Sequence, residues 1–172
     1  LPVLAGVFTR RKLPVGASWR VDETYVPVGG QWKYLYRAVD KLGRTVDFVL
    51  TAKRDVAAAR RFFERAIDLH DVAEQITIDK SGANLAGLES VNVILKFTGS
   101  GTTIKILQVK YLNNIIEQDH RFIKRITRPM LGFKAFHSAD ATLAGIETAH
   151  MIRKGQLDAN GLTAFQQFAE LA

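Results

Sequence analysis

Residues 19–51, which decide the fold, read WRVDETYVPVGGQWKYLYRAVDKLGRTVDFVLT. Aromatic and β-branched residues dominate three runs, and Pro27-Val-Gly-Gly30 and Asp40-Lys-Leu-Gly43 separate them. Short turns that contain glycine connect adjacent antiparallel strands. The stretch therefore predicts a three-stranded antiparallel meander, with strands at residues 19–26, 31–39 and 44–51.

The hydrophobic period changes from two to 3.6 after the third run. Asp55 can cap a helix whose apolar stripe runs from Val56 to Ile67, and residues 74–79 follow as a short strand. A strand, helix and strand in this succession predict a right-handed parallel crossover. We expect a second helix at residues 81–91, a fifth strand at 102–109 and a final helix at 139–154. The fold class is therefore α/β, with a mixed five-stranded sheet flanked by helices.

The segment 111–125, YLNNIIEQDHRFIKR, predicts an amphipathic helix. At about 100° per residue, Glu117 shares one face with Arg121, Lys124 and Arg128, and the isoleucines lie on the other side. A carboxylate in a row of cations suits a metal ligand that also meets a polyanion. A solvated helix with an i, i+4 ion pair has the same pattern. Asp119 falls among the apolar residues. This position suggests that it forms a salt bridge or supports a neighbouring metal ligand.

Composition narrows the possible partners. The chain has 172 residues, a net charge of +7 and no cysteine, which excludes disulfides, thiol nucleophiles and zinc held by cysteine. No apolar run reaches the ~18 residues of a membrane span. A dense basic patch favours a nucleic-acid partner. Between residues 105 and 134, only Glu117 and Asp119 oppose Lys105, Lys110, Arg121, Lys124, Arg125, Arg128 and Lys134.

Three acidic residues are expected to converge in this fold. Asp22 lies inside the first strand, Asp79 ends the fourth, and Glu117 opens the late helix. Carboxylates without a Cys or His cluster favour Mg²⁺ or Mn²⁺, and two such ions about 4 Å apart can promote displacement at phosphorus. Asp79 could instead cap the following helix, and Glu23, on the opposite face of its strand, could replace Asp22.

Several blocks of the sequence, in order, resemble one protein family. They are Trp19-Arg-Val-Asp22-Glu-Thr-Tyr25, Tyr34-Leu-Tyr-Arg-Ala-Val-Asp40, Thr77-Ile-Asp79-Lys-Ser-Gly-Ala-Asn84, Lys110-Tyr-Leu-Asn-Asn-Ile-Ile-Glu117-Gln-Asp-His-Arg121, Met130-Leu-Gly-Phe-Lys134, Gly145-Ile-Glu147 and Ile152-Arg-Lys-Gly-Gln156. Over these blocks the chain is similar to the IS6 (IS26-like) family of bacterial insertion-sequence transposases.

The resemblance implies a ribonuclease H-like, retroviral-integrase-like catalytic domain. In it, Asp22, Asp79 and Glu117 would be the catalytic triad that binds two Mg²⁺ or Mn²⁺ ions, and Lys124 would be the downstream basic residue of the family. The implied activity is nicking of element ends and joining of their 3′-hydroxyls to target DNA. We expect DNA contacts from Lys80, His120, Arg121, Lys124, Arg125 and Arg128. His120 could instead touch a neighbouring carboxylate.

We expect three regions: a basic arm or linker at 1–18, a DDE catalytic core at 19–156 and a C-terminal extension at 157–172. Family members usually carry a helix-turn-helix segment before the core, and residues 1–18 do not resemble one, so we do not expect this chain to recognise element ends by itself. We expect a homodimer or larger homo-oligomer on DNA, no membrane association, and a place in the bacterial cytoplasm at the nucleoid. The alternative functions are a catalytically silent DNA-binding or assembly module and, third, a ribonuclease H-type nuclease.

Overall fold

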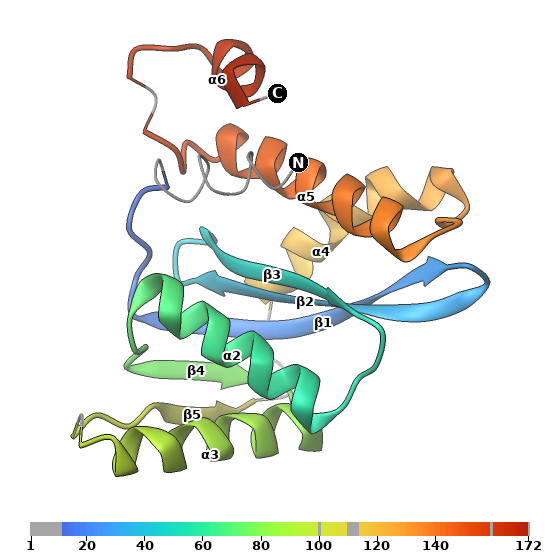
Figure 1. Ribbon diagram of the computed structural model, residues 1–172. Helices are drawn as coiled ribbons and strands as arrows, with labels where there is room; N and C mark the ends of the chain where they lie inside the picture. Colours follow the sequence, from blue (N-terminus) through green and yellow to red (C-terminus); the bar gives the residue numbers. More distant parts are fainter. Residues whose placement is uncertain (1–11, 100, 110–113, 159, 172) are drawn as a thin grey trace.

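A computed structural model of the protein describes residues 12–99, 101–109, 114–158 and 160–171. The sheet at its centre has five strands in the order β3-β2-β1-β4-β5 (Figure 1). The first three strands are antiparallel neighbours, and β4 and β5 continue the sheet in parallel with β1, which confirms the predicted mixed sheet. The strands are β1 Ser18–Val28, β2 Gln31–Asp40, β3 Thr45–Thr51, β4 Gln75–Ile78 and β5 Lys105–Gln108.

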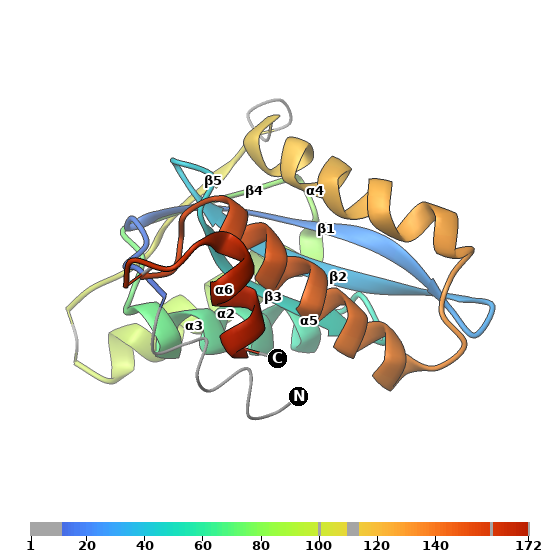
Figure 2. The ribbon, with the colours of Figure 1, turned by 90° about the horizontal axis from the view of Figure 1, so that it is seen from above.

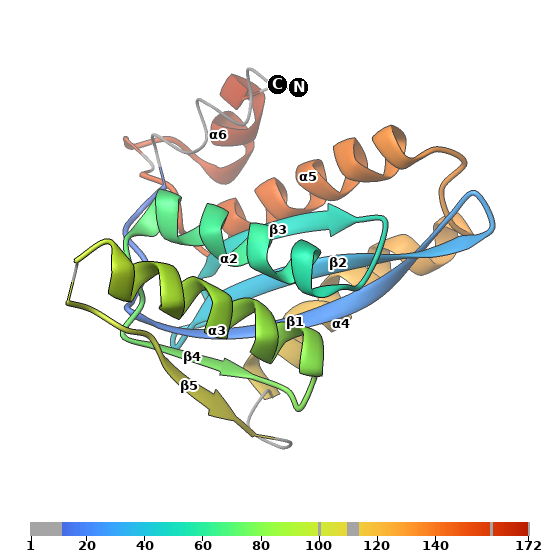
Figure 3. The same cartoon turned by 60° about the horizontal axis from the view of Figure 1, so that its bottom comes forward.

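Helices cover both faces of the sheet, with α2 and α3 on one face and α4 and α5 on the other (Figures 2 and 3). Successive side chains of a strand point to opposite faces. Trp19 and Val21 therefore pack in one core cluster with α2 and α3, and Val26 and Val28 pack in a second cluster with α4 and α5. The helices are α2 Val56–His70, α3 Gly82–Phe97, α4 Asn114–Thr127, the 3₁₀ turn η1 Arg128–Met130, α5 Phe136–Arg153 and α6 Ala164–Leu171.

The helix pair α2 and α3 shows how local sequence sets the packing. Asp55 caps α2 as predicted, because its Oδ1 accepts a hydrogen bond of 2.8 Å from the Ala58 amide. The two helices approach closely at Gly87, where an added Cβ would lie 3.0 Å from the Cβ of Ala59. A larger residue at position 87 would push α3 away from α2.

Three helices differ from the expectation. α3 continues past Val91 to Phe97, and α5 begins at Phe136, before residue 139. The last turns of α3 leave the core, since Phe97 is 87% exposed, and an apolar period no longer marks them. α6 was not predicted, although its start carries a capping box: the Thr163 amide donates to Gln166 Oε1 at 2.9 Å, and the Gln166 amide donates to Thr163 Oγ1 at 3.3 Å.

The beginning and the end of the core lie side by side next to β3. Lys12 and Leu157 form an antiparallel bridge, and the Leu13 amide donates to the Gln156 carbonyl at 2.9 Å. The buried Gln156 amide group bonds both backbone groups of Thr45, at 2.8 and 2.5 Å. Arg10 and Arg11 of the expected basic arm lie outside the described residues.

Candidate active site

The three predicted carboxylates come from the middle of β1, the end of β4 and the first turn of α4. β1 and β4 pair in parallel up to Arg20 and Thr77, and this register, continued by two residues, brings Asp22 level with Asp79. Glu117 is exposed at the start of α4, which packs on β1 and β2. The topology therefore directs all three acids to one corner of the sheet.

Asp22 is influenced electrostatically by the other two acids. Its side chain is 24% exposed, and burial raises the pKa of the carboxyl to about 7, with the negative charges of Glu23, Asp79 and Glu117 adding to the rise. A bound cation relieves this kind of like-charge repulsion and favours the ionised carboxylates. The corner therefore has the charge distribution of a cation site.

The donor set of this corner suits Mg²⁺ or Mn²⁺, because carboxylate oxygens are the ligands that hard cations prefer. In the part of the chain that the structure describes, however, no group of three or more His, Asp or Glu side chains is arranged to hold a metal ion. Asp79 is engaged by protein groups instead. Its Oδ1 accepts from the Ser81 amide at 3.0 Å, just before α3, and its Oδ2 lies 3.7 Å from Arg54 Nη2.

Glu23 lies on the opposite face of β1 from Asp22. It is buried, Asn84 Nδ2 donates to its Oε2 at 2.9 Å, and Arg54 forms an ion pair with its Oε1. Glu23, the alternative ligand suggested by the sequence, therefore has partners for both oxygens on the α3 side. Arg54, which contacts both Glu23 and Asp79, was not predicted, since no spacing marks the first residues after β3.

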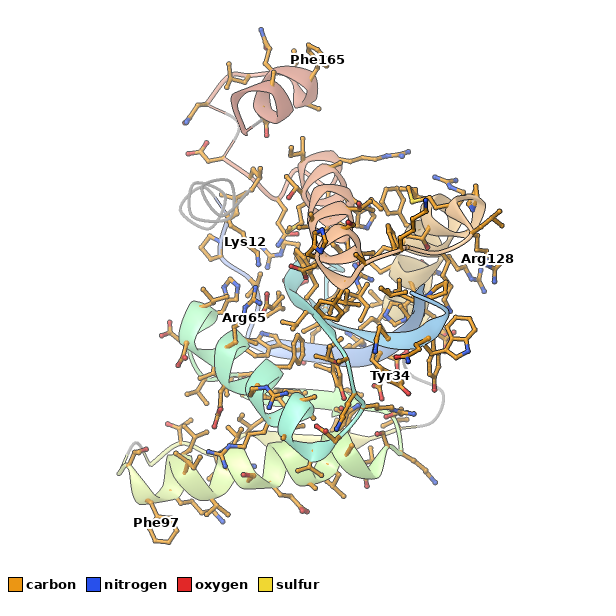
Figure 4. The ribbon with its side chains drawn as sticks, turned by 45° about the vertical axis from the view of Figure 1, so that its right-hand side comes forward. Lys12, Tyr34, Arg65, Phe97, Arg128 and Phe165 are labelled. Carbon is orange, nitrogen blue, oxygen red and sulfur yellow. The ribbon has the colours of Figure 1, made fainter. Side chains whose placement is uncertain are left out.

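α4 carries the predicted basic row. Arg121, Arg125 and Arg128 are exposed and Lys124 is half-buried, and Figure 4 shows Arg128 at the outer edge of the molecule. Ile116 and Ile123 are buried on the other side of α4, as the amphipathic pattern predicts. Lys80 is exposed beside Asp79, and Lys110 lies outside the described residues.

His120 does not lie with the exposed cations. Only 5% of it is exposed, its Nδ1 is 3.6 Å from Asp22 Oδ2, and burial lowers its pKa to about 3, so the ring is neutral. Its Nε2 is buried without a hydrogen-bond partner among the described residues. This placement favours the contact with a carboxylate over the contact with DNA.

A buried ionic network joins α4 to β2 and α5. Arg37 donates to Glu147 at 2.5 and 3.1 Å and to Asp119 Oδ2 at 3.0 Å. Asp119 also accepts from Lys154 Nζ at 2.7 Å and lies 3.1 Å from His150 Nε2. Burial opposes ionisation of Asp119, but the hydrogen bond with His150 and the charges of Arg37 and Lys154 hold its pKa well below the usual range. Asp119 therefore has the salt-bridge role that its position suggested.

One feature of the sequence indicates this network. Arg37 and Asp119 both occupy positions that face the core, and a buried charge requires a partner of opposite sign. It did not show which residues would meet, because Arg37 and Glu147 lie far apart along the chain.

A family model for a DDE domain, DDE_Tnp_IS240, matches residues 16–156. The chain belongs to this DDE domain family. The chain is also 34% identical over 154 residues to the transposase for insertion sequence-like element IS431mec of Staphylococcus aureus strain Mu50, an alignment that covers 89% of this chain. These matches confirm the resemblance to the IS6 family. The chain spans 65% of the length of that relative.

Solved structures show the same fold for this DDE domain. The catalytic core domain of HTLV-2 integrase, in complex with magnesium, aligns with a TM-score of 0.58 and 19% identity over 91% of this chain and 98% of that one. The catalytic core domain of BIV integrase aligns with a TM-score of 0.58 and 15% identity, over 90% and 95% of the two chains. The predicted ribonuclease H-like fold is thus confirmed. Of the helices described, none has the length and apolar character needed to span a membrane.

Proposed function

We propose that this DDE domain is the catalytic core of an insertion-sequence transposase, which nicks DNA and joins 3′-hydroxyls to target DNA in the bacterial cytoplasm. The observation that carries the proposal is the convergence of charge at one corner of the sheet, where Asp79 and Glu117 both act on Asp22. Membership of the DDE domain family and the transposase activity named for the Staphylococcus relative support it.

In this proposal Asp22, Asp79 and Glu117 hold two Mg²⁺ or Mn²⁺ ions. Bound divalent ions would supply activation of the attacking oxygen and stabilisation of the leaving oxygen at phosphorus. Asp79 would hold a metal ion through Oδ2 once Arg54 left this atom, and Arg54 would keep its ion pair with Glu23. The magnesium described for the HTLV-2 integrase core supports this class of cofactor.

The exposed cations would hold the DNA backbone next to these carboxylates. Arg121, Lys124, Arg125 and Arg128 lie on α4 and η1 beyond Glu117, and Lys80 lies beside Asp79. Phosphate contacts of this kind fix the position of a protein on DNA without reading its sequence. We also propose a homodimer or larger assembly on DNA, which the dimeric form described for the HTLV-2 core supports.

A strand-transfer assay tests the proposal. The chain is incubated with a labelled duplex that has a free 3′-hydroxyl, with supercoiled plasmid and with Mg²⁺ or Mn²⁺, and joined products are measured. We expect joining that requires the metal and is abolished by Asp79→Asn, because the substitution removes a negatively charged ligand. Asp68→Asn, an exposed position on α2, is the matched control and should leave joining unchanged. A folded Asp79→Asn variant with near-normal joining would refute the triad.

The second candidate is a catalytically silent DNA-binding or assembly module. The contact of Arg54 with Asp79 Oδ2, at 3.7 Å, favours it, because it occupies a predicted metal ligand. The same assay separates the candidates: a silent module binds DNA and leaves it intact, a nuclease cuts without joining, and a transposase core joins.

A further inference from the structure

The outer part of the β1–β2 hairpin extends beyond α2 and α3 and is left uncovered by them (Figures 1 and 3). Three aromatic side chains, here called the aromatic platform, lie on it: Tyr25, Trp32 and Tyr34. Tyr25 and Trp32 are 50% and 63% exposed. The ring centroid of Tyr25 is 6.2 Å from that of Trp32, edge to face, and 5.4 Å from that of Tyr34. A cluster of exposed aromatic residues is typical of a binding surface.

The aromatic platform adjoins the proposed metal site. The Tyr25 hydroxyl is 3.5 Å from Arg54 Nη1, and Nη2 of the same guanidinium is 3.7 Å from Asp79 Oδ2. Arg54, Asp79 and Lys80 also line an open pocket at the start of α3. A single arginine therefore links the platform to a predicted catalytic carboxylate, and Lys80 lies next to that carboxylate in the chain.

Aromatic rings beside cations have the chemistry that binds unpaired nucleotides, since the rings stack on bases and the cations contact phosphates. Paired bases inside a duplex do not expose their faces, whereas an unpaired base offers both faces to aromatic rings. Tyr25 lies on the Glu23 face of β1, whereas α4 and its basic row pack on the Asp22 face. A duplex backbone held by α4 therefore leaves the platform free.

We propose that the aromatic platform stacks the unpaired bases at the end of a DNA duplex whose backbone lies at Asp22, Asp79 and Glu117. The inference rests on the proposed function, because it takes DNA ends as the substrate. It adds a function for Tyr25 and Trp32, which the metal site does not use.

The first test measures binding without divalent metal, by fluorescence anisotropy. Two labelled duplexes of equal length are compared, one fully paired and one with a short unpaired end. We expect the parent to prefer the unpaired end and Trp32→Ala to reduce that preference about tenfold, the effect of losing one base–aromatic stack. Trp32→Phe should keep most of it. The control is Phe97→Ala, which removes an exposed aromatic side chain far from Tyr34 (Figure 4). It should leave the preference for the unpaired end unchanged.

Intrinsic fluorescence provides a second readout that does not depend on activity. The chain has two tryptophans, of which Trp19 is 1% exposed and Trp32 is 63% exposed. Stacking of a base on Trp32 should quench part of the emission when the duplex with the unpaired end is added. The quenching should disappear in Trp32→Phe, which retains a ring at this position and tests the assignment in a folded protein.

Any of three binding results would overturn the inference: equal binding of the two duplexes, an unpaired-end preference that Trp32→Ala leaves intact, or stronger binding of a duplex with an internal bulge. A dimer in solution that Trp32→Ala dissociates would assign the aromatic platform to a second copy of the chain and would also overturn it. If no variant joins DNA but the preference follows Trp32, the proposed function fails and the binding site stands. If joining proceeds and the preference for an unpaired end is absent, the proposed function stands and the binding site on the aromatic platform fails.

Discussion

Arg37 has no exposed surface, and its charge is balanced by Glu147 and Asp119. Removing one partner of a buried ion pair leaves the remaining charge without compensation, which typically costs about 3–5 kcal/mol. We therefore expect Arg37→Met to lower the free energy of unfolding by about 3–5 kcal/mol in urea titrations. Arg60→Met breaks an exposed i, i+4 pair with Glu64 and should cost less than about 0.5 kcal/mol. Equal effects of the two substitutions would show that the network contributes little to stability.

Among single residues, the sequence suggested candidate ligands, which stay a prediction, but it did not indicate the residues that contact them. Asp22, Asp79 and Glu117 could be chosen because strand and helix periods place them along the chain. The ion pairs of Arg54 with Glu23 and Asp79 depend on how β3 ends relative to α3, which no local period encodes. For the same reason the burial of His120 against Asp22 was only one of two alternatives.

At the scale of elements, the last residue of α2 contacts both β3 and the segment before β1. His70 Nε2 lies 2.9 Å from the Val46 carbonyl and 3.0 Å from Lys12 Nζ. Burial, and then the charge of Lys12, lowers the pKa of His70 to about 4. An unfolded histidine has a pKa of about 6.5, so the folded state binds this proton more weakly. The stability contributed by neutral His70 is complete above pH 6.5 and is lost as the pH falls towards 4.

We expect His70→Gln to remove this part of the pH dependence, because glutamine does not titrate. The measured quantity is the difference in unfolding free energy between parent and variant at a series of pH values. This difference is needed because burial raises the pKa of Asp47 to about 6, which acts in the same window with the opposite sign. His137→Gln, an exposed position on α5, is the control. A constant difference between pH 4 and 7 would contradict the prediction.

Elements were predictable where period and turn chemistry agree. The meander of β1 to β3 and the capped helix α2 satisfy both, and the structure confirms them. The end of α3 and all of α6 were missed because little of their surface packs against the core. Without that burial, their sequences show no regular spacing of apolar residues. The capping box at Thr163 was the one local signal for α6.

For the whole molecule, the DNA contacts proposed for the basic row on α4 lead us to expect a strong dependence of binding on salt. Each phosphate contact releases counterions, so affinity for random duplex should fall steeply as salt rises. Lys124→Ala should reduce the slope of log affinity against log salt by about one, and Lys96→Ala, at the far end of α3, should not. An unchanged slope in Lys124→Ala would mean that this lysine is only solvated.

Because phosphate contacts carry no sequence information, we also expect this chain to distinguish element ends from random duplex by well under the ~10³-fold ratio of specific binders. Competition binding near physiological salt measures this ratio. Resistance of a labelled terminal repeat to excess random competitor would place base recognition within the described domain.

The bridge between Lys12 and Leu157 brings the two ends of the intervening chain together without a covalent bond. Adjacent strands lie only about 5 Å apart, so the part of the domain between Lys12 and Leu157 begins and ends at nearly the same place. That is the arrangement of a module inserted into the loop of a host protein. A short linker between the two residues would yield a circular permutant, with new ends opened at the Gly29–Gly30 turn.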